Sequence, residues 1–404
     1  MVAVGKASNS THADIDIDPA VLIERARQMV PTLREREAQA IRDRRVPDET
    51  IAEFKQAGFF NVLQPKRYGG YEMSPGVYCE IAKTLAEGCM GSAWVYGVVA
   101  VHNWQLALFH PQAAEDVFGD DPETLVSSSY MPCGKPTRVE GGYRFSGRWA
   151  FSSGSAHCDW VILGANMVAE DGDGKPEPYN FLLPRSDYSI IDTWDTMGLR
   201  PTGSNDIVVE DVFVPDHRVL RERDMFEMDC PGHAQNPASL YRIPFAQVFN
   251  RTVSTTSLGA LRRALEVFIE TTRGKRTTYT GQKLANDTTI QKAVADVMLT
   301  INDLELRLAS DLAELDARAE SGDWPIERRA QLGHHTTAMV SRCVEAIDAL
   351  MLFSGGKAIY SGNVIQQAFL DIHCARAHVA NNPFPYARNV GGIAFGMDND
   401  CMDL

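Results

Sequence analysis

The pattern of apolar and polar positions divides the chain into three stretches. Residues 19–122 carry apolar residues at helical spacing, and residues 91–109 are apolar on nearly all sides, which predicts a helix buried among others. Residues 123–235 change to short alternating runs separated by Gly, Pro and Asp, which predict an antiparallel β-barrel or sandwich. From residue 236 to 404 the helical period returns and predicts a four-helix bundle. The predicted fold class is therefore α+β, with an N-terminal helical domain, a middle β domain and a C-terminal helical bundle.

The N-terminal part has two further features, a leader before the first helix and a proline within that helix. Residues 1–18 lack the apolar core of a signal peptide, and they are predicted to form a disordered leader. Pro31 falls inside the helical run of residues 19–41, so the helix is expected to kink or to restart there.

Composition excludes several classes of protein. The 39 basic and 53 acidic residues give a net charge of −14, which argues against a nucleic acid as partner. No apolar run is long enough to cross a bilayer. The eight cysteines form no CxxC pair and HExxH is absent, so no metal site is predicted. Scattered thiols of this kind are typical of a reducing compartment, and a cytoplasmic protein is expected.

The stretch WAFSSGSAHCDW, residues 149–160, places serines, a glycine and a histidine between two strand-like runs. Such a sequence is typical of a β-turn, but its hydroxyls could also hydrogen-bond the edge of a flat ligand. The chain contains neither GxGxxG nor GxxxxGK[ST]. A redox cofactor would therefore not be held by a dinucleotide fingerprint, and a tightly held nicotinamide is not expected.

Several other residues could carry chemistry. His102, on the apolar helix, is either a core histidine bonded to a carbonyl or a base with a pKa near neutrality. At least one hydroxyl of the serines at 127–129 must point inward from its strand. His373 and His378 lie near the end of the last predicted helix, at a spacing that does not suit a metal pair. Lys275 and Arg276 are either solvated charges at a helix end or a clamp for the phosphate of a ligand.

Several longer motifs point to one family. They are RRVPDETI (residues 44–51), LQPKRYGG (63–70), GSAWV (91–95), HNWQLALF (102–109), SSSYMPCG (127–134), SSGSAH (152–157), PRSDY (184–188), GSND (203–206) and DIHCARAH (371–378). The chain resembles the oxygenase components of two-component flavin-dependent aromatic hydroxylases, of the p-hydroxyphenylacetate and phenolic-secosteroid hydroxylase type. The resemblance covers nearly the whole chain after the leader and implies the acyl-CoA dehydrogenase fold, in which flavin lies between the β domain and the bundle.

On the substrate side, the resemblance implies that His102 faces the hydroxyl of a phenol as base or hydrogen-bond acceptor. Ser128 would bond the same hydroxyl. One relative has a substrate-binding arginine near the entrance to the bundle, where this chain offers only Arg242 or Arg251. That difference counts against a small carboxylated substrate.

On the flavin side, the resemblance implies that Ser153 bonds flavin N5 and helps to stabilise a C4a-hydroperoxide. His378 would lie beside the flavin and oxygen, and Trp94 would help to wall the pocket. Lys275 and Arg276 would contact a flavin phosphate.

The implied activity is hydroxylation of a phenolic ring ortho to its hydroxyl, with O2 and reduced flavin (FMNH2 or FADH2) delivered by a separate NAD(P)H-dependent reductase. A homotetramer is implied as well. One alternative is the same oxygen chemistry on an indole, an amine or a thioether. Another is an acyl-CoA dehydrogenase-like enzyme, although residues 367–404 contain no glutamate to serve as its base. A scaffold that binds flavin or aromatic compounds without catalysis is the third.

Overall fold

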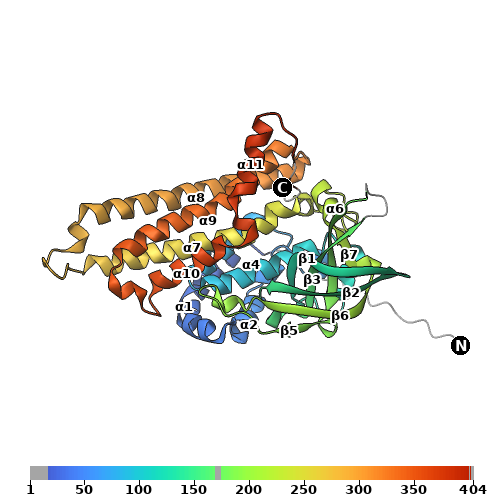
Figure 1. Ribbon diagram of the computed structural model, residues 1–404, viewed down its shortest axis with the longest axis horizontal. Coiled ribbons are helices and arrows are strands. Elements are labelled where there is room, and N and C mark those ends of the chain that lie inside the picture. The colour runs from blue at the N-terminus through green and yellow to red at the C-terminus, as the bar shows by residue number, and fades with distance from the viewer. Residues whose placement is uncertain (1–16, 169–173, 400, 402–404) are drawn as a thin grey trace.

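The structure, a computed structural model, describes residues 17–168, 174–399 and 401. Figure 1 shows a long helical bundle at one end of the molecule and a twisted sheet at the other, with α4 between them. Of the predicted leader, residues 1–16 lie outside the described residues. Asp18 begins the first helix, because its carboxylate accepts a hydrogen bond from the amide of Ala20 at 2.8 Å.

The N-terminal part is helical, as the apolar spacing predicts. It consists of α1 (Pro19–Asp43), α2 (Asp48–Gln56), α3 (Pro75–Ala86), α4 (Met90–Gln105) and α5 (Pro111–Phe118). Every residue of α4 is buried, which explains why its sequence is apolar on all sides. This helix passes through the centre of the molecule and supplies side chains to the site described below.

Of the two outcomes predicted for Pro31, a kink or a restart of the helix, the restart is wrong. Helix α1 runs unbroken through Pro31, which lies on its exposed side. A proline frees the carbonyl four residues earlier, which here belongs to Arg27 on the same exposed side. Water can bond that carbonyl, so the buried face of the helix continues undisturbed.

Among the described residues, seven strands follow in the middle of the chain. They are β1 (Val126–Val139), β2 (Gly142–Ser152), β3 (Trp160–Val168), β4 (Pro176–Pro184), β5 (Ser189–Ile191), β6 (Asn205–Pro215) and β7 (Val219–Arg221), in the spatial order β5-β6-β2-β1-β3-β4-β7. Their inward side chains form a separate apolar core, in which the rings of Phe145 and Phe181 stack at 4.2 Å. The alternating runs of the sequence therefore correctly predicted that this part consists of strands.

One strand pair departs from the predicted antiparallel arrangement. Strands β1 and β3 are parallel, with Val126 opposite Trp160. Strand β2 first returns along the second half of β1, and the turn at Ser155–His157 then brings the chain back to the beginning of β1. Strand β3 therefore starts beside Val126 and runs in the same direction as β1.

The C-terminal part contains the four predicted helices and one more. Helices α7 (Phe245–Arg273), α8 (Thr288–Ser321), α9 (Ile326–Phe353) and α10 (Val364–Arg376) form the bundle, while the short α6 (Glu222–Glu227) precedes it. A further helix, α11 (Pro383–Ala394), follows α10 and projects from the bundle at the top of Figure 1. The bundle and the sheet meet around α4.

Two glycines let the loops of the β region approach α4 closely. A Cβ atom on Gly91 would lie 2.8 Å from the ring of Pro201. A Cβ atom on Gly154, whose φ is +73°, would lie 2.9 Å from Cγ1 of Val95. Both contacts are shorter than side chains tolerate, so the two glycines set the distance from α4 to the loop before β6 and to the turn after β2.

Candidate active site

His102 lies near the end of α4 with its ring fully buried. Its Nδ1 lies 2.7 Å from the carbonyl oxygen of Val126, which can only accept, so Nδ1 must carry the proton. Its Nε2 is buried and has no hydrogen-bond partner among the described residues. Burial lowers the pKa of His102 to about 4. At neutral pH the ring is therefore uncharged and offers an unused acceptor.

Aromatic side chains lie beside this acceptor. The ring of Tyr130 is 6.3 Å from the His102 ring and contacts Phe249 edge-on at 5.1 Å. Phe245 stacks on Phe249 at 5.3 Å, and both are only partly buried. The hydroxyl of Tyr130 donates to Oε1 of Gln105 at 2.6 Å. The surroundings of His102 are thus aromatic, with neutral hydrogen-bonding groups.

Ser128 lies on β1 on the same face as Tyr130, because alternate residues of a strand share a face. Burial raises the pKa of Tyr130, and the neighbouring hydroxyl of Ser128 and the amide of Gln105 oppose that rise. The flanking serines are committed elsewhere: Ser127 bonds Ser152 at 3.2 Å, and Ser129 donates to the carbonyl of Ala150 at 2.7 Å. Of the three serines, Ser128 is the one that lies on the Tyr130 side.

Ser153 lies in the turn after β2, between two residues with left-handed backbone. Phe151 has φ +68° and Gly154 has φ +73°, so the chain bends sharply on both sides of Ser153. The Ser153 hydroxyl accepts from Nε1 of Trp94 at 3.3 Å and lies 2.7 Å from the hydroxyl of Ser204. The turn therefore holds Ser153 against α4 on one side and against residues 199–204 on the other.

His378 lies just beyond the end of α10, close to its predicted position, but α11 follows, so α10 is not the last helix. Its Nδ1 accepts from the amide of Ala380 at 3.1 Å, so in the neutral ring Nε2 carries the proton. Its ring contacts the Trp94 ring edge-on at 5.7 Å. Burial lowers the pKa of His378 to about 4, so the ring is a neutral donor at neutral pH.

Helix α4 joins these residues into one site. Trp94 and His102 are eight residues apart on it, or about 12 Å along the axis. At one end, Trp94 contacts both Ser153 and His378. At the other end, His102 lies near Tyr130 and Ser128. The structure thus brings five of the seven predicted site residues to one helix.

Comparison with known proteins decides between the classes of enzyme that this fold supports. The models of the acyl-CoA dehydrogenase N-terminal and C-terminal domains match residues 21–113 and 252–383. The oxygenase subunit HsaA of a flavin-dependent monooxygenase from Rhodococcus jostii (strain RHA1) is 37% identical, over 89% of this chain and 94% of its own. The chain belongs to the oxygenase subunits of flavin-dependent monooxygenases.

Two further similarities agree with that assignment. The oxygenase component of p-hydroxyphenylacetate 3-hydroxylase from Acinetobacter baumannii is 30% identical, over 96% of this chain and 93% of its own. The crystal structure of 3-HSA hydroxylase from Rhodococcus sp. RHA1 superposes with a TM-score of 0.90 at 35% identity, covering 96% of this chain and 100% of that one. The resemblance inferred from the motifs is confirmed, and so is the acyl-CoA dehydrogenase fold.

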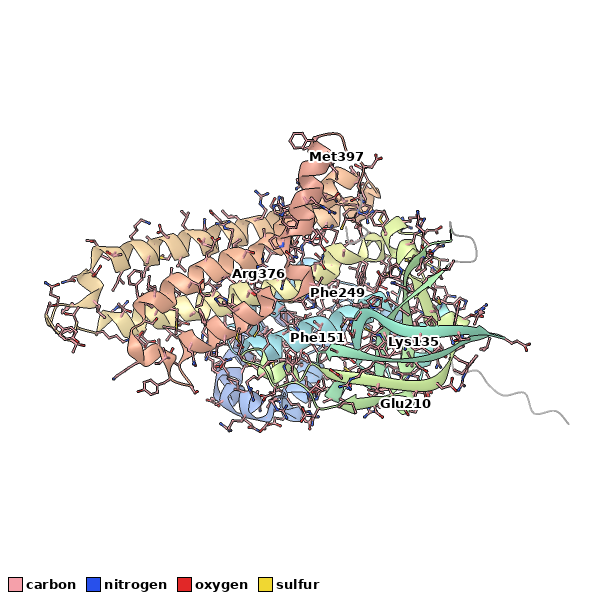
Figure 2. All side chains as sticks on the ribbon, in the orientation of Figure 1. Lys135, Phe151, Glu210, Phe249, Arg376 and Met397 are labelled. Atoms are coloured by element: carbon pink, nitrogen blue, oxygen red, sulfur yellow. The ribbon has the colours of Figure 1, made fainter. Side chains whose placement is uncertain are left out.

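The residues at one end of α4 fit a flavin. Ser153 and His378 offer a hydroxyl and a ring N–H, and neither carries a charge at neutral pH. Phe151, two residues before Ser153, is 59% exposed. Its backbone has a left-handed φ. Figure 2 places Phe151 where the bundle meets the sheet. An exposed aromatic ring beside these groups is suited to contact a planar aromatic ligand.

Lys275 and Arg276 lie far from these residues within one chain. They form part of a small hairpin between α7 and α8. The backbones of Arg276 and Lys283 form an antiparallel bridge there, and the guanidinium of Arg276 donates to the carbonyl of Gly281 at 2.7 Å. Figure 1 shows the connection of α7 to α8 at the end of the bundle that is remote from the sheet. The predicted phosphate clamp is therefore not joined to Ser153 in the same chain.

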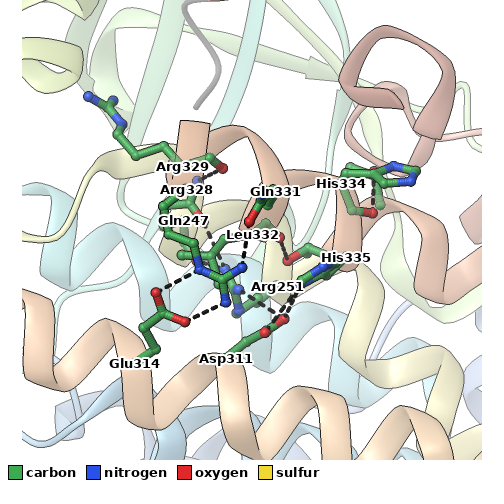
Figure 3. Close-up of polar contacts among 12 residues, drawn as sticks. Gln247, Arg251, Asp311, Glu314, Arg328, Arg329, Gln331, Leu332, His334 and His335 are labelled. Carbon is green, nitrogen blue, oxygen red and sulfur yellow. Dashed lines mark hydrogen bonds and ion pairs between the residues drawn. The ribbon is translucent and has the colours of Figure 1, made fainter. Parts of the chain in front are cut away.

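Neither arginine considered for a substrate carboxylate lies free in the site. Arg251 is buried inside the bundle, where it donates to the carbonyl of Gln247 and lies 4.0 Å from Asp311 (Figure 3). Burial lowers the pKa of Arg251. Arg242 lies on the surface, just before α7. Arg251 is therefore held in the interior of the bundle, whereas the side chain of Arg242 is exposed to solvent.

Several residues of the site, including Tyr130, Gln105 and Ser204, were not predicted from the sequence. Tyr130 and Gln105 lie inside recognised motifs, but their mutual hydrogen bond joins a strand to a helix and has no local signal. Ser204 lies in the GSND motif and pairs with Ser153 across 51 positions. Its hydroxyl continues to Thr202 in the same connection, which is rich in hydroxyl side chains. Among the described residues, no helix is both long and apolar enough to span a membrane.

Proposed function

We propose that this oxygenase hydroxylates a phenolic ring at the carbon next to its hydroxyl group. The reaction takes the phenol, O2 and reduced flavin to the catechol, water and oxidised flavin, so atoms and electrons balance. The observation that carries the proposal is the buried, unpartnered Nε2 of His102, held beside an aromatic wall. An unused acceptor in an apolar site is costly unless a ligand supplies the donor, and a phenol hydroxyl is such a donor.

His102 acts as a hydrogen-bond acceptor rather than as a strong base. With a pKa of about 4, its ring is too weakly basic to remove the phenol proton fully. Its Nε2 instead holds the phenol O–H and draws the proton away from the oxygen. That raises electron density at the neighbouring ring carbon, which is the position to be oxygenated. Ser128, on the Tyr130 face, bonds the same phenol oxygen.

The flavin occupies the other end of α4. When bound, the reduced flavin supplies the two electrons with which O2 is activated for transfer of one oxygen atom. Ser153 bonds flavin N5, His378 donates its Nε2–H toward the oxygen side, and Trp94 walls the pocket. These groups and the surrounding apolar residues keep bulk water away from the reacting atoms.

The substrate is a neutral phenol with an apolar body. The walls beside His102 are Tyr130, Phe245 and Phe249, with the Gln105–Tyr130 pair as the neutral polar group. Arg251 is committed to the interior of the bundle and Arg242 to the surface. A substrate carboxylate in this pocket would lose its hydration without forming an ion pair with Arg251 or Arg242.

The oxygenase works as a homotetramer with a separate NAD(P)H-dependent flavin reductase, from which reduced flavin arrives by diffusion. In such an assembly the exposed hairpin of Lys275 and Arg276 reaches the flavin phosphate of a neighbouring copy. The described residues include all eight cysteines and no disulfide, which agrees with a reducing compartment such as the cytoplasm.

A product assay tests the function. The purified oxygenase is supplied with reduced FMN or FAD by any flavin reductase, and neutral phenols, carboxylated phenols, indoles and thioethers are compared by mass spectrometry. The proposal predicts catechols from neutral phenols and little product from carboxylated ones. Oxygenated indole or thioether without any catechol would contradict it, as would rapid flavin oxidation without product.

A further inference from the structure

A chain of three hydroxyls leads away from Ser153 into the loop before β6. The hydroxyl of Ser153 lies 2.7 Å from that of Ser204, which lies 2.6 Å from that of Thr202. Thr202 donates to the carbonyl oxygen of Leu199 at 2.9 Å. Ser204 and Thr202 are 4% and 2% exposed, so bulk water does not compete for these bonds.

The carbonyl at the end of the chain favours one direction for every bond. Each hydroxyl has one proton, and a carbonyl can only accept. If Thr202 gives its proton to Leu199, Ser204 must donate to Thr202, and Ser153 must then donate to Ser204. The Ser153 oxygen keeps two acceptor sites, of which one takes the N–H of Trp94 at 3.3 Å. The other is free to accept from a ligand.

Three separate parts of the fold hold the residues at the two ends of the hydroxyl chain. The backbone of Leu199 is left-handed, with φ 51°, and its N–H donates to the carboxylate of Asp371 on α10 at 2.6 Å. The carbonyl of Thr202 accepts from the amide of Gly154 at 2.8 Å, next to Ser153. The loop, the turn after β2 and the bundle therefore fix both ends of the hydroxyl chain.

We infer that Ser204 and Thr202 are positioning residues that make Ser153 an acceptor and so favour reduced over oxidised flavin. The inference rests on the proposed contact between Ser153 and flavin N5. Reduced flavin carries a proton on N5 and can donate to Ser153, whereas N5 of oxidised flavin has only a lone pair. To bond oxidised flavin, the chain has to reverse and Thr202 has to release Leu199.

Reversal of the chain is not forbidden, and this limits the size of the effect. The oxygen of Leu199 also accepts from the amide of Thr202 at 3.1 Å and from Nε1 of Trp194 at 3.0 Å. It therefore stays bonded when the hydroxyl turns away. The preference corresponds to roughly one neutral hydrogen bond, or about fivefold to tenfold in the ratio of dissociation constants.

Anaerobic titrations with reduced and with oxidised FMN and FAD test this inference without turnover. The measured quantity is the dissociation constant for oxidised flavin divided by that for reduced flavin. Thr202→Val and Ser204→Ala are expected to lower this ratio about fivefold to tenfold. Thr202→Ser keeps the hydroxyl and is expected to retain the ratio of the unaltered chain.

Ser155→Ala is the matched control. Ser155 lies in the same turn, is fully buried, and its hydroxyl has no partner among the described residues. The same loss of a buried hydroxyl there is expected to leave the ratio unchanged.

The outcomes separate the two proposals. If the unaltered chain binds no reduced flavin, the proposed function fails. If it prefers reduced flavin and the ratio is the same in Thr202→Val and Ser204→Ala, only the positioning role is overturned. A parallel loss of affinity for both flavin states would indicate a merely structural role and would overturn the inference as well.

Discussion

At the scale of single residues, two histidines have opposite roles because of the backbone groups that they contact. A carbonyl fixes the proton of His102 on Nδ1, which leaves Nε2 as an acceptor. An amide N–H takes the lone pair of His378 Nδ1, which leaves Nε2–H as a donor. The acceptor suits the phenol and the donor suits the oxygen side of the flavin. Neither role can be predicted from the residue type alone.

Replacement of His102 tests the acceptor role. His102→Ala is expected to lower the rate of phenol hydroxylation by on the order of a hundredfold, because the phenol O–H loses its partner. Reduced flavin should bind unchanged, and hydrogen peroxide should replace the catechol as product. Catechol and peroxide are both measured in a coupled assay with a reductase.

The matched control is His373→Ala. His373 lies on α10 with a partly exposed ring that pairs with Asp348 at 2.8 Å, outside the site. Its replacement should leave the yield of catechol unchanged. Equal loss of activity in both variants, or full hydroxylation by His102→Ala, would remove His102 from the reaction.

The pH dependence follows from the lowered pKa values of the two histidines. Since both fall from the ordinary 6.5 to about 4, neither ring titrates near neutrality, and they should cause no inflection in kcat above about pH 5. Unfolded histidine binds a proton below about pH 6.5, so these sites cost folding stability as the pH falls from there toward 4. An inflection of kcat near pH 6.5 that His102→Ala abolishes would contradict this account.

At the scale of elements, the turn after β2 depends on a glycine that is both left-handed and closely packed. In Gly154→Ala the new methyl group meets Val95 at 2.9 Å in addition to the strain of φ +73°. Gly141→Ala has the same kind of strain, with φ +75°, but nothing lies within 4 Å. Gly141→Ala is expected to cost about 1 kcal/mol of unfolding free energy, and Gly154→Ala at least about 1 kcal/mol more.

Denaturant unfolding measures both free energies. Equal losses in the two variants would show that α4 does not pack tightly on the turn. The expected larger loss in Gly154→Ala should also weaken flavin binding, because the turn carries Ser153.

Helix α10 is tied to the loop before β6 by a buried acid. Asp371 accepts from the amide of Leu199 at 2.6 Å and from Gln367 at 2.9 Å, and burial raises its pKa to about 7. The folded chain then binds a proton here that the unfolded chain has lost above about pH 4. The stability contributed by Asp371 should therefore fall as the pH rises from about 4 to about 7.

Asp371→Asn tests this linkage. The amide cannot ionise, so the difference in melting temperature between Asp371→Asn and the unaltered chain should shift in favour of the variant as the pH rises through this range. A difference that is independent of pH would contradict the raised pKa.

The elements show what the sequence could predict and what it could not. Spacing of apolar residues predicted the buried α4 and the bundle because those signals are local. It missed α11, whose Pro383 and two adjacent glycines at 391–392 resemble a loop. It also missed the parallel pairing of β1 with β3, since the partner of a strand is set by the path of the chain. The bond from Ser153 to Ser204 was hidden for the same reason.

At the scale of the whole molecule, the proposed role of the hairpin between α7 and α8 connects flavin binding to assembly. Lys275 and Arg276 lie at the end of the bundle remote from Ser153 (Figure 1). Lys275→Ala with Arg276→Ala is expected to weaken the binding of reduced FMN about tenfold, because a charged contact to phosphate from a neighbouring copy is lost. Light scattering should give a tetramer for both chains.

The matched control for this double variant is Lys292→Ala. Lys292 is an exposed lysine on α8 that pairs with Asp296, so its replacement removes a surface charge without touching the hairpin. Unchanged flavin affinity in the double variant would contradict the role of the hairpin. A monomeric unaltered chain would contradict it as well.

The most direct test of the account is the fate of isotopically labelled O2. The oxygenase, a flavin reductase and a neutral phenol are incubated under labelled O2, and the product is examined by mass spectrometry and NMR. The account predicts a catechol with one labelled oxygen atom on the carbon next to the original hydroxyl, and label in the water formed. A product without label, or label on an atom other than that ring carbon, would contradict it.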